Sequence, residues 1–189
     1  REAVGELQAL GIAFLNLKEE YLYADLPIIL PEIKGVIRKH QGKVIIDVGG
    51  DEVGTRVLSS LAEAFSPNEY ELLLVVNANR PFTNDVEGCL KLIRVIETVS
   101  RLKLTGLISN THLLTETDIE TILAGLQLTR ELSARTGLPV AFFSAAEDVL
   151  DQIDPDCVDV PVLALDRLLL KPWERRQVRP KGSSAKPGE

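Results

Sequence analysis

The sequence predicts an α/β fold in which a mostly parallel β-sheet is covered by helices on both faces. Five short runs rich in Val, Ile, Leu and Phe recur along the chain, and segments with helical spacing of apolar residues lie between them. Several of these runs lack an alternation of apolar and polar residues, which is typical of strands buried on both faces of a parallel sheet. Alternating strands and helices with short connections indicate right-handed crossovers between parallel strands.

The expected strands are the apolar runs themselves. In chain order they are residues 11–17, 43–48, 70–78, 102–110 and 138–144. Helices are expected before Gly11 and over residues 31–40, 55–65, 84–101 and 117–136. Beyond residue 145 a helix is expected over AEDVLDQI, and VPVLALDRLLL is either a short strand or a packed arm.

The fourth expected helix, residues 84–101, carries a clear amphipathic pattern. Four apolar side chains recur at spacings of three and four and form one face: Val86, Leu90, Ile93 and Ile96. Cys89 lies beside this stripe, so we expect its thiol in the core.

The start and stop signals of the two longest helices are also readable. Asn84 with Glu87, and Thr117 with Glu120, have the spacing of a capping box. Gly137 follows the last apolar position of the second helix and is expected to end it. These signals place both helices between expected strands, as an α/β fold requires.

Composition limits the possible functions. The chain has 189 residues, 45% hydrophobic and 26% charged, with a formal net charge of −7. This balance predicts one globular domain over residues 1–171 and a flexible polar tail over 172–189, and it disfavours a broad basic surface for nucleic acid. No apolar run reaches the roughly 20 residues that cross a bilayer. The two cysteines lack metal-ligand spacing, so a reduced, cytoplasmic chain is expected.

Residues 43–54, KVIIDVGGDEVG, suggest a phosphate site and were compared with three templates. The dinucleotide fingerprint fails because Asp51 occupies the place of its second glycine. The P-loop fails because Thr55 and Arg56 stand where Lys and Ser or Thr are needed, and Asp51 would place a negative charge in the cradle. The third template fits: an aspartate, here Asp47, ends an apolar strand before a glycine-bearing turn and holds Mg²⁺ beside the phosphates.

Three segments in order carry a resemblance to a known class. KVIIDVGGDEVGTRVL, YELLLVVNANRPFT and LTGLISNTHLL together resemble the CobQ/CobB/MinD/ParA class of nucleotide-binding P-loop NTPases, which includes the nitrogenase iron protein. The resemblance covers approximately residues 1–145 and is strongest over 43–112. It implies a P-loop NTPase-like fold, the cofactors ATP and Mg²⁺, a homodimer that encloses nucleotide, and a protein partner whose process the ATPase drives.

The resemblance also implies roles for particular residues. Asp47 is the expected magnesium ligand and, with Asp51, a catalytic residue. The expected nucleotide-binding residues are Gly49 and Gly50 in the switch turn, Asn77 and Arg80 after the next strand, and Asn110, whose amide matches the adenine-recognising position.

The departure from the class is the missing Gly-rich P-loop with its Lys and Ser or Thr. The chain contains no methionine and begins at Arg1, so we expect that residues precede Arg1 in the natural protein and carry this loop. ATPase activity would depend on that segment, because Asp47 alone leaves most of the phosphate charge uncompensated. The first strand of the sheet is expected to be missing with this loop, which would expose apolar surface, so the chain alone is expected to be unstable or to associate.

Each site residue also has a structural interpretation. Asp47 has the residue type that caps a following helix, Asn110 suits a turn, and Asn77 with Arg80 suits a solvated loop. The alternative function is a non-enzymatic α/β interaction module that has lost the nucleotide site. A phosphoacceptor receiver domain is a third possibility, disfavoured because LPVAFFSAAED supplies no lysine at the end of its strand.

Overall fold

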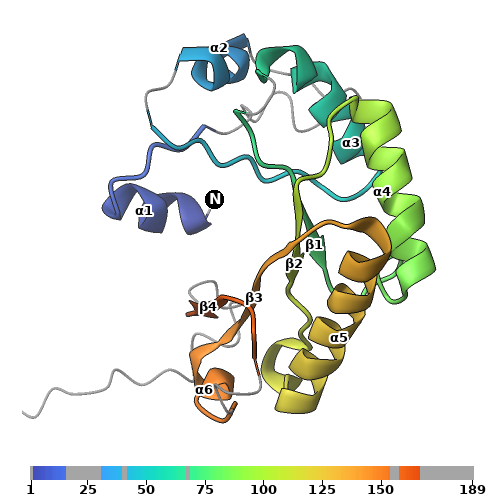
Figure 1. The fold of residues 1–189 in the computed structure, drawn as a ribbon. Helices are drawn as coiled ribbons and strands as arrows, with labels where there is room; N and C mark the ends of the chain where they lie inside the picture. The colour runs from blue at the N-terminus through green and yellow to red at the C-terminus, as the bar shows by residue number, and fades with distance from the viewer. Residues whose placement is uncertain (1, 16–30, 40–41, 67–68, 154–157, 167–189) are drawn as a thin grey trace, which may run out of the picture. The chain divides into compact units, whose positions relative to one another are not determined.

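A computed structural model describes residues 2–15, 31–39, 42–66, 69–153 and 158–166 (Figure 1). The chain divides into two compact units, the first formed by residues 1–14 with the chain from Asp166 onward and the second by Leu15–Leu165. The first contains helix α1, Glu2–Ala9. The second contains every other described helix and strand. The expected tail over 172–189, and with it the domain boundary at residue 171, lies outside the described residues.

The second unit is built on a four-stranded parallel sheet. Its strands are β1 (Leu73–Val76), β2 (Gly106–Ser109), β3 (Val140–Ala146) and β4 (Val162–Leu165), and they lie in the order β1-β2-β3-β4. All three strand pairs are parallel. The predicted α/β class and parallel sheet are therefore confirmed. Within VPVLALDRLLL, Val162–Leu165 forms a short strand, and the part of that segment after Asp166 lies outside the described residues.

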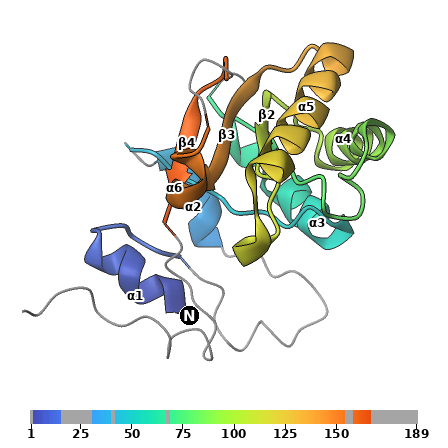
Figure 2. The ribbon, with the colours of Figure 1, turned by 90° about the horizontal axis from the view of Figure 1, so that it is seen from below.

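Helices connect and cover these strands. They are α2 (Pro31–Lys39), α3 (Glu52–Leu61), α4 (Val86–Ser100), α5 (Ile119–Thr136) and α6 (Glu147–Leu150), with short 3₁₀ helices η2 (Ala62–Ala64) and η3 (Leu114–Glu116). Figures 1 and 2 show α3, α4 and α5 on the same side of the sheet. On the opposite face Val75 is 50% exposed and Leu163 is 47% exposed.

The core lies between the sheet and the helices of the covered face. One cluster joins buried residues of α3, β1, α4, β2 and α5, among them Leu58, Val76, Ile96 and Leu107. A second cluster joins α5, β3 and α6 through Leu126, Phe143 and Val149. Cys89 is fully buried in the first cluster, which confirms its predicted place. Burial raises the pKa of its thiol to about 11, helped by the negative charge of Asp85, so the thiol is unreactive near neutral pH.

Helices α4 and α5 begin one residue later than the capping boxes predict. Asp85 caps α4 by accepting a 2.7 Å hydrogen bond from the Gly88 amide, and Asp118 caps α5 by accepting a 2.8 Å bond from the Thr121 amide. Asp and Asn are both strong caps, so the pattern alone did not decide between neighbouring positions. Gly137 ends α5 with φ +74°, as predicted.

Two expected strands are wrong. Residues 43–49 adopt no regular secondary structure, and residues 11–15 of the run expected over 11–17 form no strand either, residues 16–17 lying outside the described ranges. Ile45 is 93% exposed, although it stands in the middle of KVIIDV. β1 has only β2 beside it in the described part of the chain, so its other edge is open, yet residues 43–49 form no ladder with that edge. Apolar composition alone therefore did not produce a strand.

Candidate functional site

The turn over residues 49–54 joins the 43–48 segment to helix α3. Asp51 is the N-cap: its Oδ1 accepts a 2.7 Å hydrogen bond from the Gly54 amide, and its carbonyl accepts a 2.8 Å bond from the Thr55 hydroxyl. A Cβ on Gly54 would lie 1.9 Å from the Gly49 carbonyl oxygen. Backbone approaches backbone so closely here that the turn accepts only glycine at position 54.

The first turn of α3 is partly occupied by its own cap. The Gly54 amide, one of the amides that a phosphate at a helix N-terminus would need, donates to the Asp51 side chain. The Thr55 amide makes the ordinary helical bond to the Asp51 carbonyl at 3.0 Å. The structure thus agrees with the electrostatic argument that residues 49–54 are not a P-loop.

Asp47 does not cap helix α3, which was the structural interpretation given for it above. The cap of α3 is Asp51, and Asp47 is exposed on the segment that forms no strand. A buried strand that fixes the Asp47 carboxylate is therefore not seen, which corrects the geometric premise of its predicted magnesium role. Gly49 and Gly50 lie in the exposed turn that follows.

The loop after β1 is held by Asn77, whose side chain is buried. Asn77 Oδ1 accepts a 2.9 Å hydrogen bond from the Asn79 amide, and the Asn77 carbonyl accepts a 2.7 Å bond from the Thr83 hydroxyl. Arg80 is exposed in this loop. Asn77 thus has a loop-forming role, in line with its structural interpretation, and it presents Arg80 at the carboxyl end of β1.

Phe82 is a residue of this loop that the sequence analysis missed. It is 75% exposed and has φ +72°, a left-handed conformation that is uncommon for an aromatic residue. The dipeptide Pro81-Phe82 between Arg80 and the start of α4 was the available signal, because an apolar ring in a polar loop outside the helical stripe has no core position to fill.

The loop after β2 lies against the loop after β1. The Asn110 amide donates to the Val76 carbonyl at 2.8 Å, and the Thr111 Oγ1 accepts a 3.0 Å hydrogen bond from the Ala78 amide. Burial, together with the positive charge of Arg80, lowers the pKa of His112. Arg80 is therefore close enough to the second loop to act on it electrostatically.

The structure consequently brings three of the predicted site residues to one edge of the sheet, Asn77, Arg80 and Asn110. This is the carboxyl edge, where open α/β sheets bind ligands. The Asn110 side chain is half-buried and has no hydrogen bond to another described residue. In the described part of the chain, no hydrogen bond or ion pair joins the turn 49–54 to this edge.

The side chains at the candidate site differ in how well they suit Mg²⁺ and nucleotide. Among the described residues, no group of three or more His, Cys, Asp or Glu side chains can enclose a metal ion. Mg²⁺ is commonly held by one or two carboxylates together with phosphate oxygens and water, so a single aspartate such as Asp47 fits only when phosphates supply the other ligands. The carboxyl edge offers polar groups for a base and an anion, but no Gly-rich cradle.

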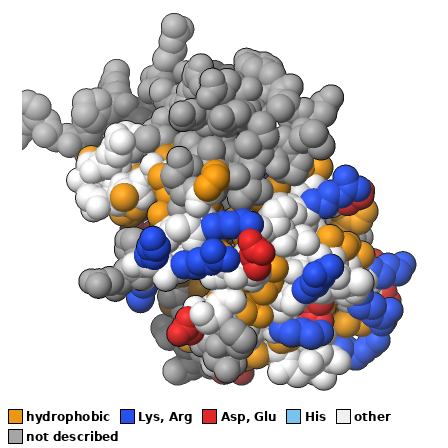
Figure 3. Space-filling view, turned by 90° about the horizontal axis from the view of Figure 1, so that it is seen from above, with side chains coloured by type: hydrophobic (Ala, Val, Ile, Leu, Met, Phe, Trp, Pro, Cys, Tyr) orange, Lys and Arg blue, Asp and Glu red, His pale blue; other side chains and the backbone are white. Residues whose placement is uncertain are grey.

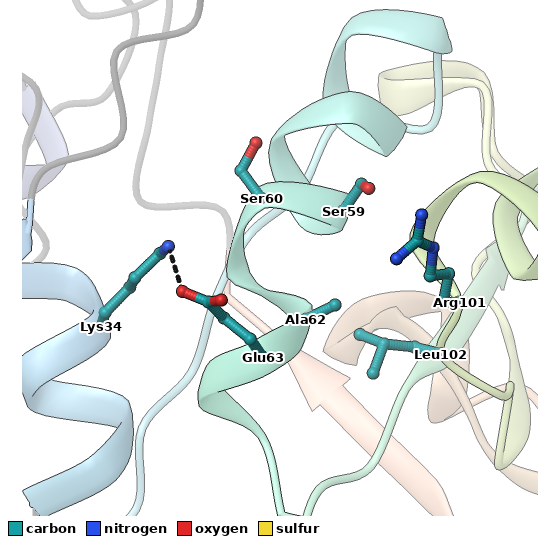
Figure 4. Close-up of a pocket in the computed structure, with 7 residues that line it drawn as sticks. All are labelled: Lys34, Ser59, Ser60, Ala62, Glu63, Arg101 and Leu102. Atoms are coloured by element: carbon teal, nitrogen blue, oxygen red, sulfur yellow. Dashed lines mark hydrogen bonds and ion pairs between the residues drawn. The ribbon is translucent and has the colours of Figure 1, made fainter.

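A hollow of about 500 Å³ lies away from this edge, between α2, the end of α3 and the end of α4 (Figure 4). Its lining residues are Lys34, Ser59, Ser60, Ala62, Glu63, Arg101 and Leu102. Lys34 donates a 2.7 Å hydrogen bond to Glu63 there. None of the predicted nucleotide-binding residues lines this hollow, so it is a separate surface feature.

Comparison with protein-family models, with curated proteins and with solved structures finds no significant match to this chain. Within the described residues, no helix is both long enough and apolar enough to cross a membrane.

Replacing Asp51 with alanine is expected to lower the free energy of unfolding by about 0.5–2 kcal/mol, because the Gly54 amide loses its acceptor. Asp51→Asn keeps an Oδ1 acceptor and is expected to retain most of this stability. Urea unfolding of the two variants beside the parent chain measures the difference. Equal losses in both variants would show that the carboxylate charge, and not the cap, is what α3 requires.

Proposed function

We propose that this protein is an ATP-binding switch protein of the ParA/MinD-like class, which couples ATP binding and hydrolysis to the process of a protein partner. The observation that carries the proposal is the placement of Arg80 and Asn110 on the two loops that follow neighbouring parallel strands at the carboxyl edge. An amide and a guanidinium placed a strand apart suit the two ends of a nucleotide, a purine edge and a phosphate.

In this proposal Asn110 recognises adenine. Its backbone is fixed by the bond to the Val76 carbonyl, while its half-buried amide keeps both its donor and its acceptor for the base. Arg80 lies on the neighbouring loop and compensates phosphate charge. Phe82, exposed beside it, offers a ring face to the nucleotide or to the second subunit of a homodimer.

The proposal further assigns the phosphate end to the turn before α3. Asp47 would hold Mg²⁺, and the bound ion would neutralise phosphate charge. Asp51 uses Oδ1 for the cap and would orient water through its second oxygen. Gly49 and Gly50 would let the backbone approach the γ-phosphate and move when that phosphate leaves. A Gly-rich loop is still required, and the side of β1 opposite β2 is the place in the sheet for the strand that brings it.

The test is calorimetry with Mg·ATP on the protein purified from its own cell, after its N-terminal sequence has been read. Asn110→Ala is expected to weaken ATP binding by about tenfold or more, because the base loses a paired donor and acceptor. Asn79→Ala, an exposed neighbour of Asn77, is the matched control and should bind normally. Equal affinity in both variants would remove Asn110 from the site.

Turnover separates binding from catalysis. Asp47→Ala is expected to abolish ATP hydrolysis and leave the melting temperature unchanged, because its carboxylate is exposed. Asp51→Asn should keep the fold and lose turnover. Unchanged hydrolysis in Asp47→Ala would refute the magnesium assignment.

A second candidate is the non-enzymatic interaction module. It is favoured by the first turn of α3, where the Gly54 amide is bonded to the Asp51 side chain and the Asp51 carboxylate would repel a phosphate. A natural protein that begins near Arg1 and gives no heat with Mg·ATP would establish this alternative in place of the ATPase.

A further inference from the structure

Helix α4 carries a row of basic side chains on its solvent side. Lys91, Arg94 and Arg101 are exposed, and Thr98 completes the spacing of three, four and three that places them on one face. At a rise of 1.5 Å per residue the row extends for about 15 Å. The opposite face of the helix, with Cys89, Ile93 and Ile96, is buried in the core. We call the three cations the α4 basic row.

The basic row has no counter-ions within the described part of the chain. The two acidic residues of α4 are engaged elsewhere: Glu87 pairs with Arg135 at 3.0 Å, and Glu97 pairs with Lys103 at 2.7 Å. No described carboxylate forms an ion pair with any of the three cations. This concentration of positive charge is unexpected on a chain whose formal net charge is −7.

The row ends at the hollow described above. Figure 4 shows the Arg101 side chain turned toward Ser59, while Lys34 is bonded to Glu63 across the same space. Arg101 is the C-cap of α4 with φ +63°, so its side chain leaves the helix at this end. Lys34 and Arg38 lie 2.7 and 3.8 Å from the Glu63 carboxylate. Two cations therefore share one carboxylate, and the net charge around the hollow is positive.

Figure 3 shows several Lys and Arg side chains on the face seen from above, with acidic side chains beside some of them. Two apolar side chains lie on α4 beside the row, Val95 at 46% exposure and Val99 at 38% exposure. The surface therefore combines a line of cations, a small apolar strip and hydroxyl donors at one end.

We infer that the α4 basic row and the adjoining hollow form a docking surface for an acidic segment of a partner protein. The segment lies along α4, pairs its carboxylates with Lys91 and Arg94, and packs apolar side chains on Val95 and Val99. One carboxylate enters the hollow between Arg101 and the hydroxyl of Ser59. We infer an acidic protein segment because its carboxylates complement the charge of a short, narrow line of three cations.

Two other anionic partners fit less well. Duplex nucleic acid carries one charge per about 1.7 Å of its axis and is held by a broad basic surface with many phosphate contacts, whereas this row has three cations on an acidic chain. An anionic membrane surface is bound through larger apolar side chains such as Trp, Phe and Leu, whereas α4 offers two half-exposed valines.

Fluorescence anisotropy with a labelled 15-residue helical peptide tests the inference. The peptide carries Glu every three or four residues on one face with Leu beside them, and a second peptide has Gln in place of each Glu. The tested variant is Lys91→Gln, Arg94→Gln and Arg101→Gly, in which glycine suits the positive φ of position 101. The control variant is Lys39→Gln, Lys43→Gln and Arg130→Gln, which removes the same charge from other elements and leaves the partners of Glu87 and Glu97 in place.

We expect the Glu peptide to bind the parent chain and the control variant, and to bind the basic-row variant at least about tenfold more weakly. Binding should weaken between 0.05 and 0.5 M salt, the Gln peptide should not bind, and circular dichroism should show equal melting temperatures. Equal affinity for the two variants would overturn the inference. Stronger binding to a 30-base-pair DNA duplex, or to vesicles containing phosphatidylserine, would also overturn it by assigning the surface to another partner.

Discussion

Substitution of Gly125 by alanine is expected to lower the free energy of unfolding by about 1–3 kcal/mol, although alanine is the better helix former. A Cβ at this position of α5 would lie 2.1 Å from Thr111 Oγ1 and 2.2 Å from Thr111 Cβ. Rotating the Thr111 side chain cannot relieve the second contact, because its Cβ is attached directly to the backbone. The helix or the loop after β2 has to move.

The movement would also reach the candidate site. Thr111 Oγ1 accepts the hydrogen bond from the Ala78 amide that ties the loops after β1 and β2 together, and Asn110 precedes it. Gly35→Ala in α2 is the matched control, since nothing lies within 4 Å of its Cβ and alanine should stabilise that helix by about 0.5–1 kcal/mol. Urea unfolding measures both changes. A gain in stability for Gly125→Ala would show that α5 does not pack on Thr111 as closely as described.

The largest single loss of stability is expected for Leu107→Ala, at about 2–5 kcal/mol. Leu107 is completely buried at the centre of β2, and it contributes to the cluster that joins α3, β1, α4 and α5. Truncation to alanine removes apolar contacts and leaves a cavity, because strands and helices on all sides restrict collapse. A domain of this size has a total stability of about 5–15 kcal/mol, so this change consumes a large share of it.

The control for Leu107→Ala is Ile45→Ala. Both remove an aliphatic side chain from an apolar run that was expected to be a strand, but Ile45 is 93% exposed. Its truncation is expected to change stability by no more than about 0.5 kcal/mol. Chemical unfolding of the two variants under identical conditions decides the matter. A large loss at Ile45 would mean that KVIIDV is buried in the folded chain.

The sequence by itself determined the α/β class, the helices α4 and α5, and the strands β1, β2 and β3. The expected helices at 84–101 and 117–136 became Val86–Ser100 and Ile119–Thr136. This succeeded because apolar spacing and helix stop signals act over a few residues, and Gly137 and Cys89 could be placed from their neighbours alone.

The sequence also singled out the residues of the candidate site, but not their arrangement. Asn77, Arg80 and Asn110 were expected after consecutive strands, and parallel pairing brings them to one edge. Phe82 was missed, because its exposure and its positive φ depend on the loop that Asn77 and Thr83 hold. Local pattern contains no information on such a loop bond.

Only the tertiary structure decided the rest. KVIIDV has the composition of a strand, yet a strand also requires ladder hydrogen bonds, and this segment makes none with the open edge of β1. Asp51, and not Asp47, caps α3 because the turn brings its carboxylate to the Gly54 amide. The cations of α4 that are unpaired within the described residues could be recognised only from the structure, in which Glu87 pairs with Arg135 on α5 and Glu97 pairs with Lys103 just beyond the end of α4.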